Sequence, residues 1–257
     1  MLSSDTFQGR TALVTGGSSG IGLAVAQSLA KLGANIAIIG RDETKLDSAV
    51  KSMVSYGRLV RGYRADVRDY EAVRTVTEQI GAELGPISLL VNSAAGNFRV
   101  DPLNLSPNGW RAVVDIVLNG TWNVTQLVGR VAIESQNPLS VVNIGTSAAE
   151  IGSATTVHSA SAKSGVLAMT KSLAAAWAGH GIRLNVLTPG LTEDTGGVGA
   201  LYGSAEELAQ HCMEIPLGRF AKKEEIADAC AFLLSDHAGY ITGTNLVIDG
   251  GRQLGTH

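Results

Sequence analysis

A glycine-rich turn near the start of the chain carries the clearest chemical signal. Residues 15–22 read TGGSSGIG and lie between a predicted strand and a predicted helix. Gly16 permits a tight turn, Gly20 lets the backbone approach a pyrophosphate, and Gly22 lets the helix pack closely on the sheet. The N–H groups that open the helix would face the phosphates. This placement predicts a dinucleotide site, and its residues in the turn are Gly16, Ser18, Ser19, Gly20, Ile21 and Gly22.

A basic residue follows the second predicted strand, where the ribose of an adenine dinucleotide would lie. NAD-selective sites place a carboxylate there to bind the ribose 2′-hydroxyl. Here Gly40 leaves room and Arg41 suits the additional 2′-phosphate of NADP. A charge-assisted bond of roughly 1.5–3 kcal/mol gives about a ten- to hundredfold preference for NADP(H). We expect Asp42 to cap the next helix and to point away from the ribose.

A carboxylate also follows the third predicted strand. Asp66, which precedes Val67, could accept a hydrogen bond from the adenine amino group. The alternative is a solvated loop aspartate without a ligand. Both residues are included in the predicted cofactor site.

The segments that must position these residues alternate along the chain. Strands are predicted at 11–15, 35–39, 60–64, 88–92, 141–144, 183–187 and 244–249. Helices are predicted at 20–32, 42–56, 69–84, 108–135, 158–179 and 223–235. Because the strand runs are mostly apolar and alternate with helical patterns, we expect an α/β fold with a doubly wound parallel sheet flanked by helices.

One long segment, 189–203, lacks clear periodicity. A loop of this length in a compact domain is usually a lid or a binding loop, although a surface loop is the alternative. Tyr202 lies in it. No linker or composition shift divides the chain, so we expect one catalytic domain over residues 1–257.

The bulk composition excludes several classes of protein. A net charge of −3 gives no electrostatic attraction to nucleic acid or to an anionic membrane. We find no signal peptide and no stretch long enough to span a bilayer. Two cysteines in 257 residues are not a disulfide scaffold and fit a reducing compartment, so we expect a cytoplasmic protein. The five histidines have no metal-ligand spacing, and no metal is expected.

Over nearly its whole length the chain resembles the short-chain dehydrogenase/reductase family. The motifs that carry the resemblance are the glycine turn, NSAAG at 92–96, Asn119, Lys163, PG at 189–190 and IDGG at 248–251. The resemblance implies a single Rossmann-like domain and a homotetramer. It implies that Lys163 holds the nicotinamide ribose and that Asn119 anchors a water in a proton relay. The remaining cofactor contacts that we expect are Asn92, Ala94, Pro189, Gly190 and Thr192.

The family's catalytic tyrosine is absent. Its position, four residues before Lys163, is occupied by Ser159. One helical turn of spacing places both residues on one face, but a serine is shorter than a tyrosine and its hydroxyl is far less acidic. This difference argues against ordinary ketone reduction.

A narrower resemblance accounts for the serine. Residues 92–98, 115–121, 159–163 and 195–197 resemble the 2,4-dienoyl-CoA reductases, which also carry a serine before the lysine. The resemblance implies that hydride from NADPH reaches the distal carbon of a conjugated double bond, and that the resulting dienolate is then protonated. It assigns the thioester oxygen to Asn97. The upstream tyrosine of many members is replaced here by Ala148, and the aspartate of another variant by Val117.

Hydrogen-bond donors therefore replace a strong acid in our hypothesis. Asn97, with Ser147 or Thr146, would hold the oxygen. A water ordered by Asn119 and Lys163 would donate the proton, because an enolate can be protonated after the hydride has been transferred. Preorganised donors around an oxyanion can be the largest catalytic contribution. The candidate catalytic residues are Asn97, Asn119, Thr146, Ser147, Ser159 and Lys163. Tyr202 is a less favoured substitute donor.

Three functions stay open. The first is NADPH-dependent reduction of a conjugated C=C in an enoyl or dienoyl thioester, with an acyl-CoA as the small-molecule partner. The second is a short-chain dehydrogenase/reductase that acts on a carbonyl or alcohol with an atypical proton donor. The third is an NADP(H)-binding protein with little or no catalysis. Asn119 and Lys163 weigh against the third, and the missing tyrosines weigh for it.

Overall fold

One parallel sheet of seven strands forms the centre of the computed structural model, which describes residues 2–193, 195 and 205–255. The strand order is β3-β2-β1-β4-β5-β6-β7. The strands are β1 (Thr11–Thr15), β2 (Asn35–Gly40), β3 (Val60–Arg64), β4 (Ile87–Asn92), β5 (Leu139–Ile144), β6 (Ile182–Pro189) and β7 (Asn245–Ile248). All adjacent pairs are parallel, so the predicted doubly wound α/β fold is confirmed.

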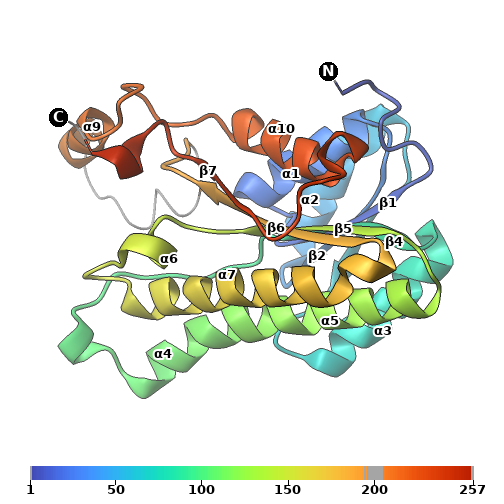
Figure 1. Ribbon diagram of the computed structural model, residues 1–257, viewed down its shortest axis with the longest axis horizontal. Helices are drawn as coiled ribbons and strands as arrows, with labels where there is room; N and C mark the ends of the chain where they lie inside the picture. Colours follow the sequence, from blue (N-terminus) through green and yellow to red (C-terminus); the bar gives the residue numbers. More distant parts are fainter. Residues whose placement is uncertain (1, 194, 196–204, 256–257) are drawn as a thin grey trace.

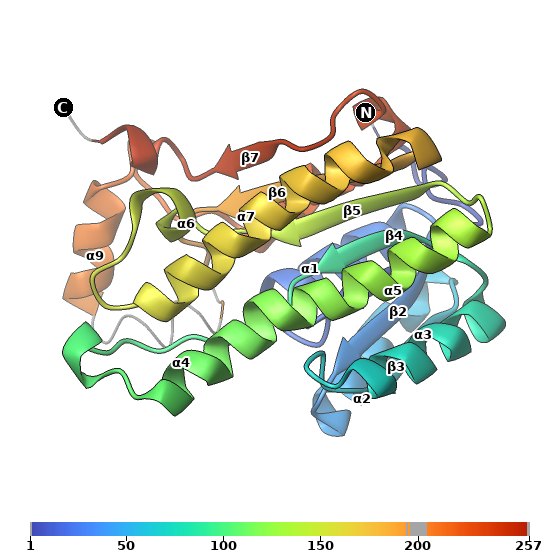
Figure 2. The same cartoon turned by 60° about the horizontal axis from the view of Figure 1, so that its bottom comes forward.

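Helices cover both faces of this sheet (Figures 1 and 2). On one face lie α1 (Gly20–Lys31), α2 (Glu43–Met53) and α10 (Lys223–Leu234). On the other lie α3 (Tyr70–Leu84), α5 (Gly120–Glu134) and α7 (Val157–Trp177). Both faces of β1 and β5 are therefore buried, which explains their continuous apolar sequences.

The helix predicted over 108–135 is present but is not α-helical throughout. It consists of α4 (Pro107–Val114), a π-helical segment (Asp115–Asn119) and α5. A π-helical turn shifts the register of the side chains that follow it, and such turns occur frequently at functional sites. Apolar periodicity could not detect this interruption because the pattern continues on both sides of it.

Two short helices were also missed by the sequence patterns. They are α6 (Ala148–Ile151) and α9 (Ala205–Met213). Smaller corrections concern helix ends: the helix predicted to reach residue 56 ends at Met53 and continues as a 3-10 turn (Val54–Tyr56). In the predicted loop 189–203, Thr192 forms an isolated bridge with Ala221. Tyr202 lies outside the described residues.

Helices α2 and α3 are each capped by the aspartate that precedes their first residue. The Asp42 side chain accepts a hydrogen bond from the Lys45 N–H at 3.1 Å, which confirms the predicted cap of α2. Asp69 caps α3 in the same way through Ala72, at 3.0 Å. Each cap satisfies a helix donor that would otherwise lack a partner. Within the described residues, no helix combines the length and apolarity needed to cross a bilayer.

Candidate functional site

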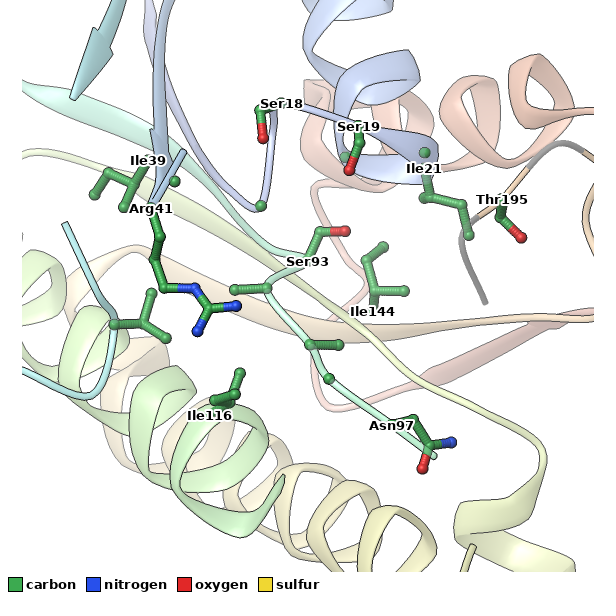
Figure 3. A pocket seen from close by; sticks show the side chains of 18 of the residues that line it. Ser18, Ser19, Ile21, Ile39, Arg41, Ser93, Asn97, Ile116, Ile144 and Thr195 are labelled. Atoms are coloured by element: carbon green, nitrogen blue, oxygen red, sulfur yellow. The ribbon is translucent and has the colours of Figure 1, made fainter. Parts of the chain in front are cut away.

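A cleft of about 820 Å³ opens at the carboxyl ends of the central strands. The strand order reverses between β1 and β4, and ligands of open α/β sheets bind at this kind of switch point. Figure 3 shows Arg41 and Asn97 extending into the cleft from opposite ends. The predicted residues that line it are Gly16, Ser18, Ser19, Gly20, Ile21, Gly22, Arg41, Asp66, Val67, Ala94, Asn97, Lys163 and Pro189.

The glycine turn has the geometry of a phosphate cradle. Gly16 and Gly20 have φ angles of 66° and 53°, in the left-handed region that favours glycine. A Cβ on Gly16 would lie 3.0 Å from the backbone of Ala94, and a Cβ on Gly22 would collide with the carbonyl of Gly16. Ser19 is the N-cap of α1 but makes no side-chain cap bond, so the first N–H groups face the cleft uncapped. These features fit a dinucleotide pyrophosphate.

Two cations lie at the end of the cleft next to β2. Arg41 lines it, with its side chain 65% exposed and therefore accessible to a ligand. Lys45 in the first turn of α2 also lines it, with its Nζ 4.0 Å from Asp42 Oδ2. Sequence reasoning missed Lys45. Its position in the first turn of the helix that Asp42 caps, directly after Arg41 and the end of β2, was the signal that could have found it.

The carboxylate of Asp66 is engaged by basic neighbours. Its two oxygens accept hydrogen bonds from Arg68 at 3.0 and 2.6 Å, and Arg41 Nη1 lies 4.0 Å away. The hydrogen bond from Arg68 is the main reason that the pKa of Asp66 is lowered. Asp66 therefore stays ionised. It can accept a hydrogen bond from an adenine amino group only while it also accepts the hydrogen bonds from Arg68.

Lys163 lies at the far end of the cleft and is buried, with 8% of its surface exposed. Its ammonium donates a hydrogen bond to the carbonyl oxygen of Ile144, at the end of β5. Burial lowers the pKa of Lys163 from 10.5 to about 8. Helix α7 and strand β5 therefore hold a partly titratable amine against the cleft.

Asn97 is oriented by its own backbone. Its Oδ1 accepts a hydrogen bond from the N–H of Phe98 at 2.9 Å. This bond turns the amide oxygen toward the Phe98 N–H and leaves the NH2 group to donate to a ligand. Asn97 lines the cleft in the loop after β4.

Several other predicted residues lie beside the cleft rather than in its lining. Asn92 is buried and its amide donates to Thr125 at 2.9 Å and to Asn143 at 2.8 Å, which joins β4 to α5 and β5. Asn119 donates to Asp115 at 2.8 Å within the π-helical segment. Ser159 is buried at the start of α7.

The remaining candidates follow β5 and β6. Thr146 and Ser147 are half-buried in the turn before α6. Gly190 packs so closely on Asp249 that a Cβ would lie 2.7 Å from its Cα. Thr192 is buried, and its hydroxyl donates to the Gly190 carbonyl at 3.1 Å. This contact ties Thr192 to the backbone next to Pro189, which does line the cleft.

No tyrosine is among the described residues that line the cleft. Ala148, at the position where the resemblance implied a tyrosine, opens α6. Val117, at the position of the alternative aspartate, is fully buried in the contact between α4 and α7. The described part of the cleft therefore offers amides, hydroxyls and one buried amine, without a phenol.

A wound parallel sheet with a glycine cradle at its switch point defines a dinucleotide-binding α/β protein. The profile of the family described as enoyl-(acyl carrier protein) reductase matches residues 16–253. The chain belongs to the short-chain dehydrogenase/reductase family of NAD(P)-dependent oxidoreductases.

Individual relatives are similar over their full lengths. A probable 2,4-dienoyl-CoA reductase [(2E)-enoyl-CoA-producing] of Bacillus subtilis is 39% identical, over 95% of this chain and 97% of its own. The crystal structure of a short chain dehydrogenase from Bacillus anthracis has a TM-score of 0.92 and 38% identity, and the match covers 99% of this chain and 100% of the other. A gluconate 5-dehydrogenase from Burkholderia cenocepacia in complex with NADP and tartrate has a TM-score of 0.91 and 33% identity, with 98% and 99% covered.

Proposed function

We propose that the protein uses NADPH to reduce a conjugated carbon–carbon double bond in an enoyl or dienoyl thioester. The observation that carries this proposal is the Asn97 amide, whose oxygen is occupied by the Phe98 N–H and whose NH2 is left for a ligand. A fixed neutral donor suits an oxygen that gains negative charge during the reaction. The probable 2,4-dienoyl-CoA reductase of B. subtilis, 39% identical, supports the same substrate class.

The reaction needs a charge to be held before a proton is delivered. Bound NADPH would supply a hydride to the distal carbon of the double bond. The electron pair then moves toward the thioester oxygen, and Asn97 would stabilise the resulting enolate by a hydrogen bond, with Ser147 or Thr146 as a second donor. Protonation at carbon completes the reduction. One oriented oxyanion donor contributes about 10²–10³ in kcat in well-studied enzymes.

The proton would come from water rather than from a phenol. Lys163 and Asn119 would order that water, and Lys163 would also hold the nicotinamide ribose. The buried ammonium, already bonded to the Ile144 carbonyl, keeps two further donors for these tasks. Ser159 lies one helical turn before Lys163 and would contribute a hydroxyl rather than a strong acid.

The remaining cofactor assignments rest on the shape and charge of the cleft. Arg41 and Lys45 would bind the 2′-phosphate of NADP, and the cradle from Gly16 to Gly22 would hold the pyrophosphate. Asp66 and Val67 would meet the adenine, and Pro189 the nicotinamide. Asn92, Gly190 and Thr192 would support these contacts from behind the lining.

The decisive experiment mixes the purified protein with NADPH and a 2,4-dienoyl-CoA and follows the nicotinamide absorbance. We expect NADPH to be consumed. Asn97→Ala should lower kcat by about 10²–10³ and leave the Kd for NADPH unchanged. The matched control is Asn137→Ala, which removes an amide at the amino end of β5, the end of the strand opposite the cleft. Unchanged turnover in Asn97→Ala would remove the proposed role of this residue.

A carbonyl reduction is the second candidate, because the gluconate 5-dehydrogenase shares the fold at 33% identity. It would require Ser159 or a water to protonate an alkoxide directly. The same assay with ketone and sugar-acid substrates separates the two functions. NADPH binding without consumption in either assay would favour a protein that binds the cofactor and does little chemistry.

A further inference from the structure

The loop that carries Asn97 is held on two sides. On one side the ring of Phe98 packs on the imidazole of His158, with centroids 4.5 Å apart and planes tilted by 37°. On the other side lies Gly109 of α4, where an added Cβ would come within 3.1 Å of Phe98 Cζ. The N–H of Val100 also donates to the Thr155 carbonyl at 2.9 Å. The loop after β4 is thus fastened to the start of α7.

His158 has an unusual environment for a polar side chain. It is fully buried, and among the described residues neither of its ring nitrogens has a hydrogen-bond partner. Burial also lowers the pKa of His158, which favours the neutral imidazole. A neutral ring without polar partners contributes to this site through its flat aromatic surface.

We propose that His158 is a positioning residue that acts through Phe98 to hold the amide of Asn97 in the cleft. This inference rests on the proposed function, in which that amide stabilises an enolate oxygen. The connection is short: the His158 ring contacts the Phe98 ring, and the Phe98 N–H bonds to Asn97 Oδ1 at 2.9 Å. Asn97 itself is exposed, so this contact restricts a side chain that packing alone does not fix.

Loss of the ring should therefore affect turnover rather than cofactor binding. We expect His158→Ala to lower kcat with a dienoyl-CoA by about tenfold to a hundredfold, the range that small misplacements of a reacting group produce. The Kd for NADPH should not change, because His158 does not line the cleft. His158→Phe keeps the ring and removes both nitrogens, so it should retain most of the turnover.

A double-mutant cycle tests whether the effect passes through Asn97. If it does, Asn97→Ala/His158→Ala should be no slower than Asn97→Ala alone, because the amide to be positioned is already gone. Phe98→Ala should reproduce the loss from the other side of the contact. If His158→Ala fails to fold, Phe98→Ala serves as the test in its place. Phe98 is partly exposed, so its removal takes away less buried packing.

The outcomes distinguish the proposed role of Asn97 in the reaction from the positioning role of His158. If Asn97→Ala leaves turnover unchanged, the proposed function of Asn97 fails. If Asn97→Ala is slow but His158→Ala and Phe98→Ala are as fast as the parent, only the positioning role is overturned. It is also overturned if His158→Phe is as slow as His158→Ala, or if the double variant is slower than Asn97→Ala.

Discussion

At the level of single residues, the chemistry is concentrated in Lys163 and Asn97 and in the cations beside β2. Lys163 is buried and bonded to a carbonyl oxygen, and no carboxylate of the described residues forms an ion pair with it. Its charged form is therefore disfavoured, and its pKa falls from 10.5 to about 8. The residue is poised to lose its charge within a pH range that an assay can cover.

The activity should decrease as the pH rises through about 8, where Lys163 loses its proton. The relevant measurement is kcat/KM for NADPH as a function of pH, because it reports the free enzyme. The same group contributes to stability in the opposite direction. Its folded pKa lies below the unfolded value, so the unfolded chain binds more protons between about 8 and 10.5 and its contribution to stability increases with pH there. A kcat/KM that stays constant through this window would contradict the role of the ammonium.

Cofactor preference should depend on the two cations next to β2. Arg41→Ala should reduce the preference for NADPH over NADH by about ten- to a hundredfold, and Lys45→Ala should reduce it by less because its ammonium is a point charge on a flexible chain. Titrations with both nucleotides measure the effect. Arg130→Ala removes the same charge from an exposed site on α5 and serves as the control. An equal loss of NADPH and NADH affinity in Arg41→Ala would show that Arg41 does not distinguish the 2′-phosphate.

At the level of elements, close packing of α5 against α7 holds the helix that carries Lys163. Gly129 of α5 faces the indole of Trp177, and an added Cβ would lie 2.5 Å from Trp177 Cζ3. The bulky ring therefore requires a glycine opposite it. Ser164 fixes the other side of α7 by donating to the Ala149 carbonyl of α6 at 2.6 Å.

A methyl group at Gly129 should separate the two helices. Gly129→Ala is expected to lower the free energy of unfolding by about 1–3 kcal/mol, the usual cost of overpacking. Gly81→Ala is the matched control, because Gly81 lies in α3 and nothing is within 4 Å of its added Cβ. It should be stabilising by about 0.4–1 kcal/mol. Urea unfolding measures both, and equal stability of the two variants would refute the packing argument.

At the level of the whole molecule, the sequence predicted the features that depend on apolar periodicity or on the residue types found in turns. The seven strands, the glycine cradle and the Asp42 cap were found because each depends on local residues. The π-helical segment and helix α6 were missed because no local pattern marks them. The contact between Phe98 and His158 was missed because these residues lie far apart in the chain and only folding brings them together. The homotetramer, the cytoplasmic location and the acyl-CoA partner stay predictions.

Residues from both halves of the chain line the cleft: Gly16 lies just after β1, and Pro189 ends β6. Neither half of the polypeptide contains enough of the lining residues to bind a dinucleotide alone. A chain that lacks either half should therefore not bind the nucleotide. Conversely, nucleotide at a hundredfold excess over its Kd would raise the free energy of unfolding of the intact chain by about 2.7 kcal/mol. The supply of cofactor would therefore also influence how well the enzyme resists heat and proteolysis.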